Sequence, residues 1–483
     1  MSTFELVQEA LIPSQKFELL NLSNGKTTET VTVQEEEEEE NLEYPSFIND
    51  LSKQFQINEI DSNKIYQNFL SNFTKSLMNK DHNHDNNKIS MIPIFKFPQN
   101  FQIFDNNLKD TKYLSIDIGG STIRICLIKF LSPTNSNNHD NNNYEIIRYK
   151  QWILNESDKL IDLKFFEKLS ERAIEVLQNY NDVSCGLVWS FPLDNCNRIK
   201  TMGKGFKIDS EVSSIPITEL LQISFQNQGK VINVNSVIND SIAVNLTTFL
   251  TDNGNQDSTI SLILGTGLNS CIQYHDQLYN VELGFFGELL NPSNYDIKLD
   301  SRFSLQGYSS FNWKFQKNRS VDGGNSLFMP LEFLCGSRYI TELIRIILNE
   351  EMGLNLGKEY ELHGEFITLF HNHKDELTIR QELIKKFNQL STLSSLQIQT
   401  IKKVIEIVLV RSSIYLQNSL LALDSLLNQD KKFKPIKINY IGSFLQNCQY
   451  LQKLMENYGF ELKFIENSNL VGGVIASLIE EKR

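Results

Sequence analysis

The feature that most constrains this chain is a pattern that occurs twice: an apolar strand, a turn containing glycine, and a second apolar strand. The first copy spans residues 112–130 (KYLSIDIGGSTIRICLIKF), and the second spans residues 259–273 (TISLILGTGLNSCIQ). Apolar runs broken by glycine predict β-hairpins, because glycine adopts the backbone conformations that tight turns require. Two copies of one device predict two similar halves that face a shared cleft.

Further strands and helices are predicted around the two hairpins. Strands are expected over residues 183–192, 231–239 and 436–442, where apolar residues gather. Helical spacing of apolar residues predicts helices over residues 57–78, 160–180, 331–353, 377–391, 398–427 and 471–482. Because strands and helices alternate along the chain, the predicted fold class is α/β.

Composition places the chain among large folded proteins. Its 483 residues are 40% hydrophobic, which supplies a large core and suggests two or three domains. This excludes collagen, whole-chain disorder and small disulfide scaffolds. The chain has 46 Lys plus Arg against 59 Asp plus Glu, a net charge of −13, so no nucleic-acid contact is predicted. Residues 1–43 contain six consecutive glutamates and are expected to form a weakly ordered acidic extension.

Cysteine usage and the lack of targeting segments predict a compartment. Six cysteines are scattered without a CxxC pair, which is typical of buried free thiols in a reducing environment. No signal peptide is visible at the N-terminus, and no run of about 18 apolar residues occurs. We therefore expect a cytoplasmic protein without membrane contact. The sequence says nothing about oligomeric state or about a nuclear pool.

The turn of the first hairpin, residues 117–124 (DIGGSTIR), has the composition of an anion site. Adjacent glycines let backbone N–H groups approach an anion closely, and the next two residues add hydroxyl donors. Asp117 stands at the strand end, where a carboxylate can hold the water shell of Mg2+. An ordinary hairpin turn is the alternative interpretation. The candidate phosphate-binding residues are Gly119, Gly120, Ser121, Thr122 and Arg124.

The turn of the second hairpin, residues 264–270 (LGTGLNS), repeats the same small residues and hydroxyls. Two such turns can grip a polyphosphate from both sides, which gives Gly265, Thr266 and Gly267 the same candidate role. Two other phosphate-binding devices are absent. Residues 25–27 lack the first glycine of a P-loop, and residues 265–267 lack the third glycine of the dinucleotide fingerprint.

Asp240 follows a predicted strand and precedes a predicted helix, in the segment VINDS (237–241). A carboxylate at such a strand end points into a cleft, where it can accept a proton from a substrate hydroxyl. The alternative is a helix N-cap, for which Asn, Asp and Ser are the usual residues.

Four other polar residues lie within apolar stretches: Ser190, Lys204, Glu282 and Glu332. Burying a charge is unfavourable without a partner, so such residues often have a specific role. Converging on a sugar, they would supply the hydrogen bonds that a polyol requires. Each alone also fits an exposed position on an amphipathic element.

These motifs, in this order, resemble the hexokinase family of ATP-dependent sugar kinases. The matching segments are DIGGSTIR, WSFP, GKGF, NDS, GTGLNS, ELGFFG, LEFLCGSRY and YIGSF, and the pattern covers roughly residues 50–483. The resemblance implies a two-lobed, actin-like (RNase H-like) ATPase fold with a central sugar cleft that closes on the sugar. It implies ATP and Mg2+ as partners, and in-line transfer carried by positioning and charge neutralisation. The lobes would comprise residues 44–110 plus 240–470 (large) and 111–239 plus 471–483 (small).

The resemblance also implies roles for individual residues. Asp240 matches the base that activates the sugar 6-hydroxyl, and Lys204 accompanies it at the catalytic centre. The other implied sugar-binding residues are Ser190, Asn239, Asn269, Glu282 and Glu332. The two glycine turns match the phosphate loops, Asp117 matches the organiser of Mg2+, and Gly442 with Ser443 matches the adenosine segment.

The chain departs from glucose hexokinases at several of these motifs. The first loop reads GGST instead of GGTN, Gly203 replaces a Thr before Lys204, Leu283 replaces a Trp after Glu282, and Leu268 stands where a Thr or another small polar residue is usual. The late motifs have become IGS (441–443) and ENSN (466–469). These changes resemble the divergent fungal branch that phosphorylates N-acetylglucosamine. Losing the indole beside Glu282 would make room for a 2-acetamido group.

Two other functions stay open. One is a glucose, mannose or fructose kinase whose site has drifted. The other is a non-catalytic, hexokinase-like regulator of sugar signalling. The retained Asp240, Lys204 and both glutamates argue against a regulator, whereas Gly203 and the weakened adenosine motif favour it mildly.

Overall fold

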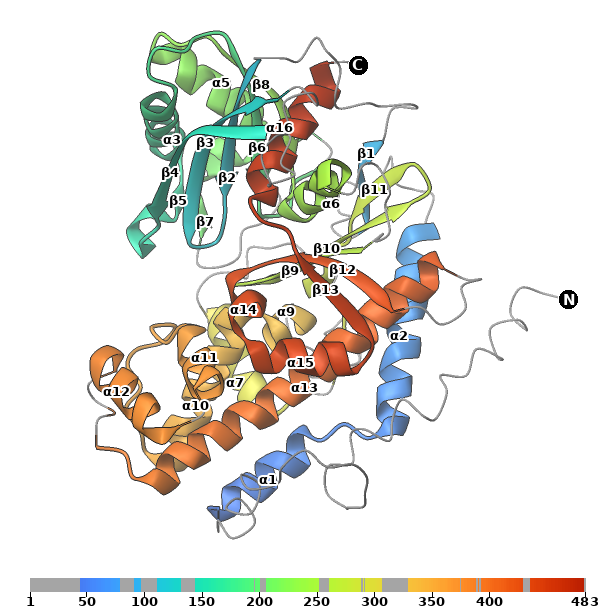
Figure 1. Cartoon of the computed structure of the whole chain (residues 1–483), viewed down its shortest axis with the longest axis vertical. Coiled ribbons are helices and arrows are strands. Elements are labelled where there is room, and N and C mark those ends of the chain that lie inside the picture. Colours follow the sequence, from blue (N-terminus) through green and yellow to red (C-terminus); the bar gives the residue numbers. More distant parts are fainter. Residues whose placement is uncertain are drawn as a thin grey trace, which may run out of the picture.

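The computed structural model shows an α/β protein built on two large β-sheets (Figure 1). It describes residues 44–78, 91–96, 111–131, 144–194, 196–199, 206–251, 260–287, 290, 292–305, 329–373, 375–387, 390, 392–428 and 435–481. The first sheet contains, in spatial order, β4 (Tyr144–Ile153), β3 (Thr122–Phe130), β2 (Lys112–Ile118), β6 (Val183–Trp189) and β8 (Ile232–Ile238). The second contains β1 (Ile92–Lys96), β11 (Gln277–Asn280), β10 (Leu268–Tyr274), β9 (Ile260–Leu264), β12 (Ile436–Ile441) and β13 (Phe460–Phe464).

The two sheets share one topology. With β1 set aside, the first three strands of each sheet along the chain form an antiparallel meander, and two later strands add in parallel on the side of the first. The spatial order is therefore third, second, first, fourth, fifth in both sheets, and the second sheet adds β1 at its edge. This repetition confirms the prediction of two similar halves, and both predicted hairpins are present.

Helices make up the rest of both halves. In the first half they are α3 (Leu163–Leu177), α4 (Ser210–Ser213) and α5 (Ile217–Asn227). In the second half they are α1 (Ser46–Phe55), α2 (Glu59–Met78), α7 (Asn294–Leu305), α9 (Pro330–Cys335), α10 (Ser337–Met352), α11 (Glu365–Asn372), α12 (Glu376–Lys386), α13 (Ser395–Leu427), α14 (Ser443–Asn447) and α15 (Gln449–Asn457). A short two-stranded sheet pairs β5 (Leu160–Ile161) with β7 (Lys207–Ile208).

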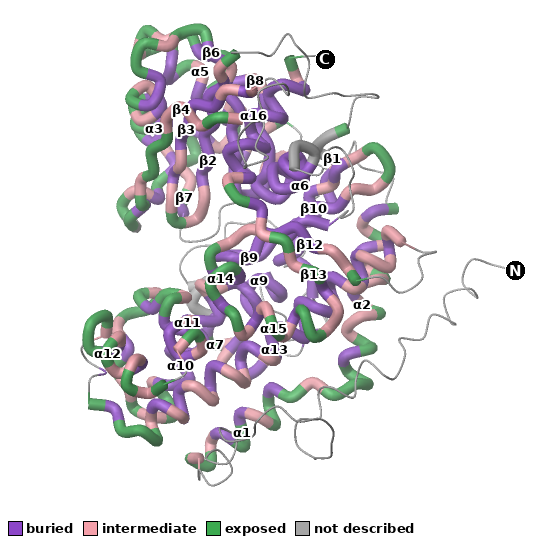
Figure 2. The backbone as a smooth tube through the Cα atoms, in the orientation of Figure 1, coloured by how far each residue is buried: buried purple, intermediate pink, exposed green. Residues whose placement is uncertain are grey.

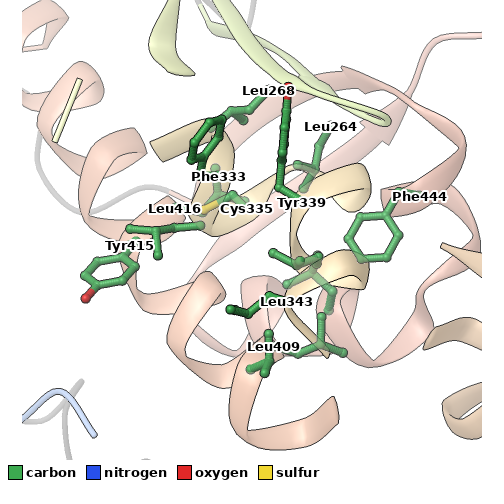
Figure 3. Close-up of a cluster of buried hydrophobic side chains, with 14 of the residues drawn as sticks. Leu264, Leu268, Phe333, Cys335, Tyr339, Leu343, Leu409, Tyr415, Leu416 and Phe444 are labelled. Carbon is green, nitrogen blue, oxygen red and sulfur yellow. The ribbon is translucent and has the colours of Figure 1, made fainter. Parts of the chain in front are cut away.

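The long helix α13 forms the centre of the second half. Its length and composition would allow it to cross a membrane, but 78% of its most apolar window is buried inside the protein. It packs against α2, α1, α9, α10 and α15, so its apolar residues belong to the core. Figure 3 shows part of this core, in which Leu409 and Leu416 lie below Leu264 and Leu268 from the strands that flank the second glycine turn. The turn is thus anchored to the core on both sides.

Two helices lie between the sheets: α6 (Asp240–Thr251) and α16 (Ser468–Glu481) (Figure 1). Helix α16 packs on β2, β6 and β8 of the first sheet, α6 packs on β9, β10 and β12 of the second, and the two helices pack on each other. Their buried faces and those of strands from both sheets form one hydrophobic cluster, and Figure 2 shows these elements coloured as buried. The two helices share a core with both halves, so neither helix belongs to one half alone. The predicted lobe boundaries stay a prediction.

Paired glycines bring α16 into direct backbone contact with its neighbours. A Cβ atom on Gly472 would lie 2.2 Å from the carbonyl oxygen of Ala243 in α6, and one on Gly186 in β6 would lie 2.0 Å from the carbonyl oxygen of Gly473. No side chain fits at either crossing, so the helix lies flush against both α6 and β6.

Most predicted elements are present, with differences at their ends. The strand expected over 183–192 ends at Trp189, and the helix expected over 160–180 begins at Leu163. That helix starts later because residues 160–161 pair as a strand and Asp162 caps the helix by accepting a hydrogen bond from the Phe165 backbone N–H. The helix expected over 331–353 is divided into α9 and α10 at Gly336. All six cysteines are free thiols, and five of them are buried, as predicted.

Candidate active site

The chain turn between β8 and α6 places Asp240 at the interface between the two halves. Asn239 acts as the helix cap, since its Oδ1 accepts hydrogen bonds from the Ser241 backbone N–H at 3.0 Å and from Ser241 Oγ at 2.8 Å. Asp240 is the first residue of α6 and is only 5% exposed. The capping role that was the alternative for Asp240 therefore falls mainly to Asn239, although Asp240 Oδ1 also accepts from Ser241 N at 2.8 Å.

A chain of buried amides connects this turn to both sheets. Asn239 Nδ2 donates to the carbonyl oxygen of Trp189 in the first sheet at 3.3 Å. Asn269 Nδ2, from β10 in the second sheet, donates to Asn239 Oδ1 at 2.9 Å and to Asn280 Oδ1 at 3.0 Å. Asn280 in turn donates to Glu282 Oε1 at 2.8 Å. The structure thus brings together three predicted sugar-binding residues, Asn239, Asn269 and Glu282.

The two glutamates are held by different means. Glu282 has a left-handed backbone (φ +51°), which turns the chain sharply just after β11. Glu332, in α9, accepts a hydrogen bond from the Leu268 backbone N–H through Oε2 at 3.0 Å. Between them, a Cβ atom on Gly284 would lie 2.8 Å from Glu332 Cβ, so glycine allows the two segments to approach. Both glutamates are buried.

The first glycine turn surrounds a fully buried carboxylate, that of Asp117. Its Oδ2 forms an ion pair with Arg124 at 2.6 Å, and its Oδ1 accepts from Asn469 Nδ2 at 3.0 Å. Burial raises the pKa of Asp117, and the negative charge of Asp240 adds to this, while Arg124 and Asn469 oppose it. Asp117 on β2 and Asp240 just after β8 lie at the same end of the first sheet, because both strands run parallel to β6 between them.

The hairpin itself uses some of the predicted phosphate-binding groups. The Gly119 backbone N–H donates to the carbonyl oxygen of Thr122 at 2.9 Å and closes the turn. The carbonyl oxygen of Ser121 accepts from the Leu154 backbone N–H. Arg124 is committed to Asp117, which raises the pKa of its guanidinium. Arg124 would therefore influence a bound phosphate mainly by neutralising and orienting the Asp117 carboxylate.

The second glycine turn rests on the start of α10 and against the predicted adenosine segment. The carbonyl oxygens of Gly265 and Thr266 accept from the backbone N–H groups of Ser337 and Arg338. On the other side, Gly442 has φ +119°, and a Cβ atom there would lie 2.2 Å from the carbonyl oxygen of Leu264. The predicted phosphate loop and the segment containing Gly442 and Ser443 are thus in contact.

Because of this contact, we predict that Gly442→Ala weakens the binding of ATP. The added methyl group forces β12 away from the turn, so we expect the KM for ATP to rise roughly tenfold or more, because small displacements of positioned groups have large effects. Gly353→Ala is the matched control, since Gly353 also has a positive φ (+64°) but nothing lies within 4 Å of its added Cβ. Steady-state kinetics should show the ATP effect only in Gly442→Ala, and equal KM values in the two variants would contradict it.

Comparison with known proteins identifies the family. Family models described as hexokinase match residues 47–249 and 259–478. The chain belongs to the hexokinase family.

Relatives of this hexokinase-family chain agree with that assignment. It is 28% identical to N-acetylglucosamine kinase 1 of Candida albicans over 441 residues, covering 81% of this chain and 86% of that protein. It is 24% identical to Hexokinase-1 of Saccharomyces cerevisiae, covering 64% of this chain and 62% of that protein. Among solved structures, a hexokinase from Schistosoma mansoni complexed with glucose has a TM-score of 0.68 at 15% identity, over 89% of this chain and 98% of that chain. The predicted hexokinase fold and sugar kinase class are therefore confirmed.

Ser190 and Lys204 are the sugar-site residues predicted from the first half. Lys204 and the preceding Gly203 lie outside the described residues. Ser190 is buried at the end of β6, and its backbone N–H donates to the carbonyl oxygen of Ile118, which places it beside the first glycine turn. The roles of these residues stay predictions.

Three residues of the site were not predicted: Ser241, Asn280 and Asn469. Ser241 directly follows Asp240, and Asn280 stands two positions before Glu282, so nearness in sequence to a predicted residue could have indicated both. Asn469 lies 352 residues from Asp117 in sequence, so spacing along the chain carries no sign of their contact.

Asp117 near the first turn and Asn469 at the start of α16 fit a hydrated magnesium ion. Within the described ranges no group of three or more His, Cys, Asp or Glu residues is arranged to hold a metal directly. However, the buried Oδ1 of Asn469 has no hydrogen-bond partner there, and its amide contacts Asp117. Magnesium typically binds one or two protein oxygens, directly or through water, together with substrate phosphates. The donor set of Asp117 and Asn469 matches that requirement.

Proposed function

We propose that this enzyme transfers the terminal phosphoryl group of ATP to the 6-hydroxyl of N-acetylglucosamine. The observation that carries the proposal is the buried Asp240 carboxylate, held at a helix start by Asn239 and Ser241 within a network that contains the predicted sugar-binding residues. The similarity to N-acetylglucosamine kinase 1 over 86% of that protein's length supports this sugar.

Asp240 is the proposed general base. A carboxylate within reach of the sugar 6-hydroxyl accepts its proton as the oxygen attacks the phosphoryl group. Asn239, Asn269, Glu282 and Glu332 would orient the remaining hydroxyls, with Ser190 and Lys204 contributing from the first half. Because phosphoryl transfer needs little covalent chemistry from the protein, positioning and charge neutralisation account for most of the rate.

ATP would lie between the two glycine turns. The turn at Gly265–Gly267 and the adjoining Gly442 and Ser443 would hold the phosphates and adenosine from the second half. Asp117 and Asn469 would hold hydrated Mg2+ from the first, with Arg124 paired to the Asp117 carboxylate. A bound Mg2+ neutralises charge on the phosphate oxygens during transfer.

The cytoplasmic location stays a prediction.

The choice of sugar depends on residues near the glutamates. Leu283 and Leu268 are both almost completely buried in the core of the second half. Leucine at position 283 is smaller than the indole found in glucose hexokinases, and its backbone N–H donates to Asn269 Oδ1. We propose that the reduced volume lets the segment around Glu282 accommodate the 2-acetamido group.

A coupled assay of ADP release tests the function. With N-acetylglucosamine and glucose measured side by side, we expect kcat/KM to be roughly tenfold or more higher for N-acetylglucosamine, a ratio typical of a pocket that differs by one small group. Faster turnover of glucose would indicate the alternative hexose kinase. Turnover of neither sugar would favour the non-catalytic regulator.

A further inference from the structure

One buried amide, that of Asn280, lies at the centre of the polar network. Its Oδ1 accepts a hydrogen bond from Asn269 Nδ2 at 3.0 Å and lies 3.3 Å from Ser241 Oγ, and its Nδ2 donates to Glu282 Oε1 at 2.8 Å. The residue is only 2% exposed. It therefore contacts three segments of the site, through Asn269, Ser241 and Glu282, while remaining almost inaccessible to a ligand.

The chemistry of Glu282 fixes which way the Asn280 amide faces. A carboxylate oxygen accepts hydrogen bonds and cannot donate them, so the nitrogen of Asn280 must face Glu282. Its oxygen then faces Asn269, which must present its own nitrogen. The two amides consequently have one permitted orientation each.

The far side of Asn269 agrees with this orientation. Its Oδ1 accepts from the backbone N–H groups of Ser270 at 2.7 Å and Leu283 at 3.3 Å, which are donors only. Its two amide hydrogens go to Asn239 and Asn280. Without Asn280, one of these hydrogens would lose its partner, and Glu282 would lose a donor.

The backbone of Asn280 leaves its side chain little freedom. It is the last residue of β11 and pairs with Cys271 in β10 and with Ile92 in β1, so it has a strand on each side. The sharp turn at Glu282 follows two residues later. The backbone of Asn280 is therefore held by both neighbouring strands, and it presents the amide to Asn269 and Glu282 before any ligand binds.

We propose that Asn280 is a positioning residue for the sugar: it fixes the direction of the Asn269 amide and holds the Glu282 carboxylate in place. This inference rests on the proposed function, because it assigns those two residues to the sugar. Removing the amide should weaken sugar binding while leaving the nucleotide side of the site unchanged.

Asn280→Leu tests the proposal, with Asn245→Leu as its matched control. Leucine is close to asparagine in size but forms no hydrogen bonds. Asn245 lies on α6 and is 1% exposed, and within the described part of the chain neither polar atom of its amide has a partner. Both variants remove one buried amide, but only the first removes links to Asn269 and Glu282.

For Asn280→Leu we expect the sugar KM and the calorimetric Kd for sugar to rise roughly 10- to 100-fold, as for other lost hydrogen bonds to a buried charge. The KM for ATP should change little, and so should kcat at saturating sugar. Asn245→Leu should keep all these constants near wild type. If the leucine variant does not melt cooperatively, Asn280→Ala, which adds no atoms, replaces it with the same expectation.

The outcomes separate this inference from the proposed function. A wild-type chain that neither binds nor phosphorylates any of the sugars contradicts both. If the wild type is active and a folded Asn280 variant binds sugar as tightly as Asn245→Leu, only the positioning role is overturned. An equal rise in the KM values for sugar and ATP would also overturn it, because general loosening of the site would explain that result.

Discussion

Replacing Asp240 with Asn is expected to lower kcat by roughly 10²- to 10⁴-fold, the range typical of losing a general base, while sugar binding stays close to wild type. Asparagine has the shape of aspartate but cannot accept the proton of the sugar hydroxyl. Its Oδ1 can still accept the hydrogen bond that Asp240 accepts from the Ser241 backbone N–H at 2.8 Å. ADP release measures the loss, and titration calorimetry measures the sugar Kd.

Asp162→Asn provides the control for this experiment. Asp162 caps α3 by accepting a hydrogen bond from the Phe165 backbone N–H at 2.8 Å, and asparagine is an equally good cap. The same substitution at Asp162 should therefore leave kcat unchanged. If Asp240→Asn also turns over near the wild-type rate, Asp240 is not the base.

Replacing Asp296 with Ala should lower the free energy of unfolding by about 3–5 kcal/mol, as expected when one partner of a buried ion pair is removed. Arg411 on α13 forms a bidentate pair with Asp296 on α7, at 2.7 and 2.9 Å, and both side chains are almost completely buried. Without the carboxylate, the guanidinium stays buried beside the Phe55 ring with its charge unpaired. Urea unfolding of both proteins measures the difference.

This effect should depend on pH in a defined direction. Burial alone would raise the pKa of Asp296, but Arg411 and Ser293 overcome it and hold the pKa below its usual value. A lowered pKa in the folded state contributes stability above the unfolded pKa of about 3.9, and that stability is lost as the pH falls through the folded value. The difference in the free energy of unfolding between wild type and Asp296→Ala should therefore be constant near neutral pH and become smaller in acid.

Glu175→Ala serves as the comparison for the buried pair. Lys150 and Glu175 form an ion pair at 2.9 Å, but both side chains are 53% exposed, so water and salt screen it. Removing the Glu175 carboxylate should therefore change the free energy of unfolding little. If Asp296→Ala is no more destabilising than Glu175→Ala, the buried pair does not stabilise this fold.

The hairpins and their glycine turns could be predicted because they are local. Residues 112–130 and 260–274 each form their strands and turn within one short segment, and buried strands appear as apolar runs. Strand β4 was not predicted, since its ten residues lie at a sheet edge and none is fully buried, which leaves no apolar run. Strand β13 is similarly mixed in burial.

The network around the site could be predicted only in part. The functional candidates Asp240, Glu282 and Glu332 stand in distinctive local motifs. Their partners depend on contacts between distant segments: Asn269 with Asn239, Leu268 with Glu332, and Asn469 with Asp117. Polar residues such as Asn280 and Asn469 are common in loops and at strand ends, so only the folded arrangement distinguishes them.

The flush seating of α16 has a mechanical consequence. At Gly472 and Gly473 there is no side chain to flex and take up a displacement, because main chain presses on main chain. Moving the helix by the width of a methyl group would pull its Asn469 away from Asp117 and push on α6, whose first residue is Asp240. The positions of Asp240, the proposed proton acceptor, and Asp117, the proposed metal organiser, are therefore coupled through the contact between α6 and α16. A shift of one carboxylate should displace the other.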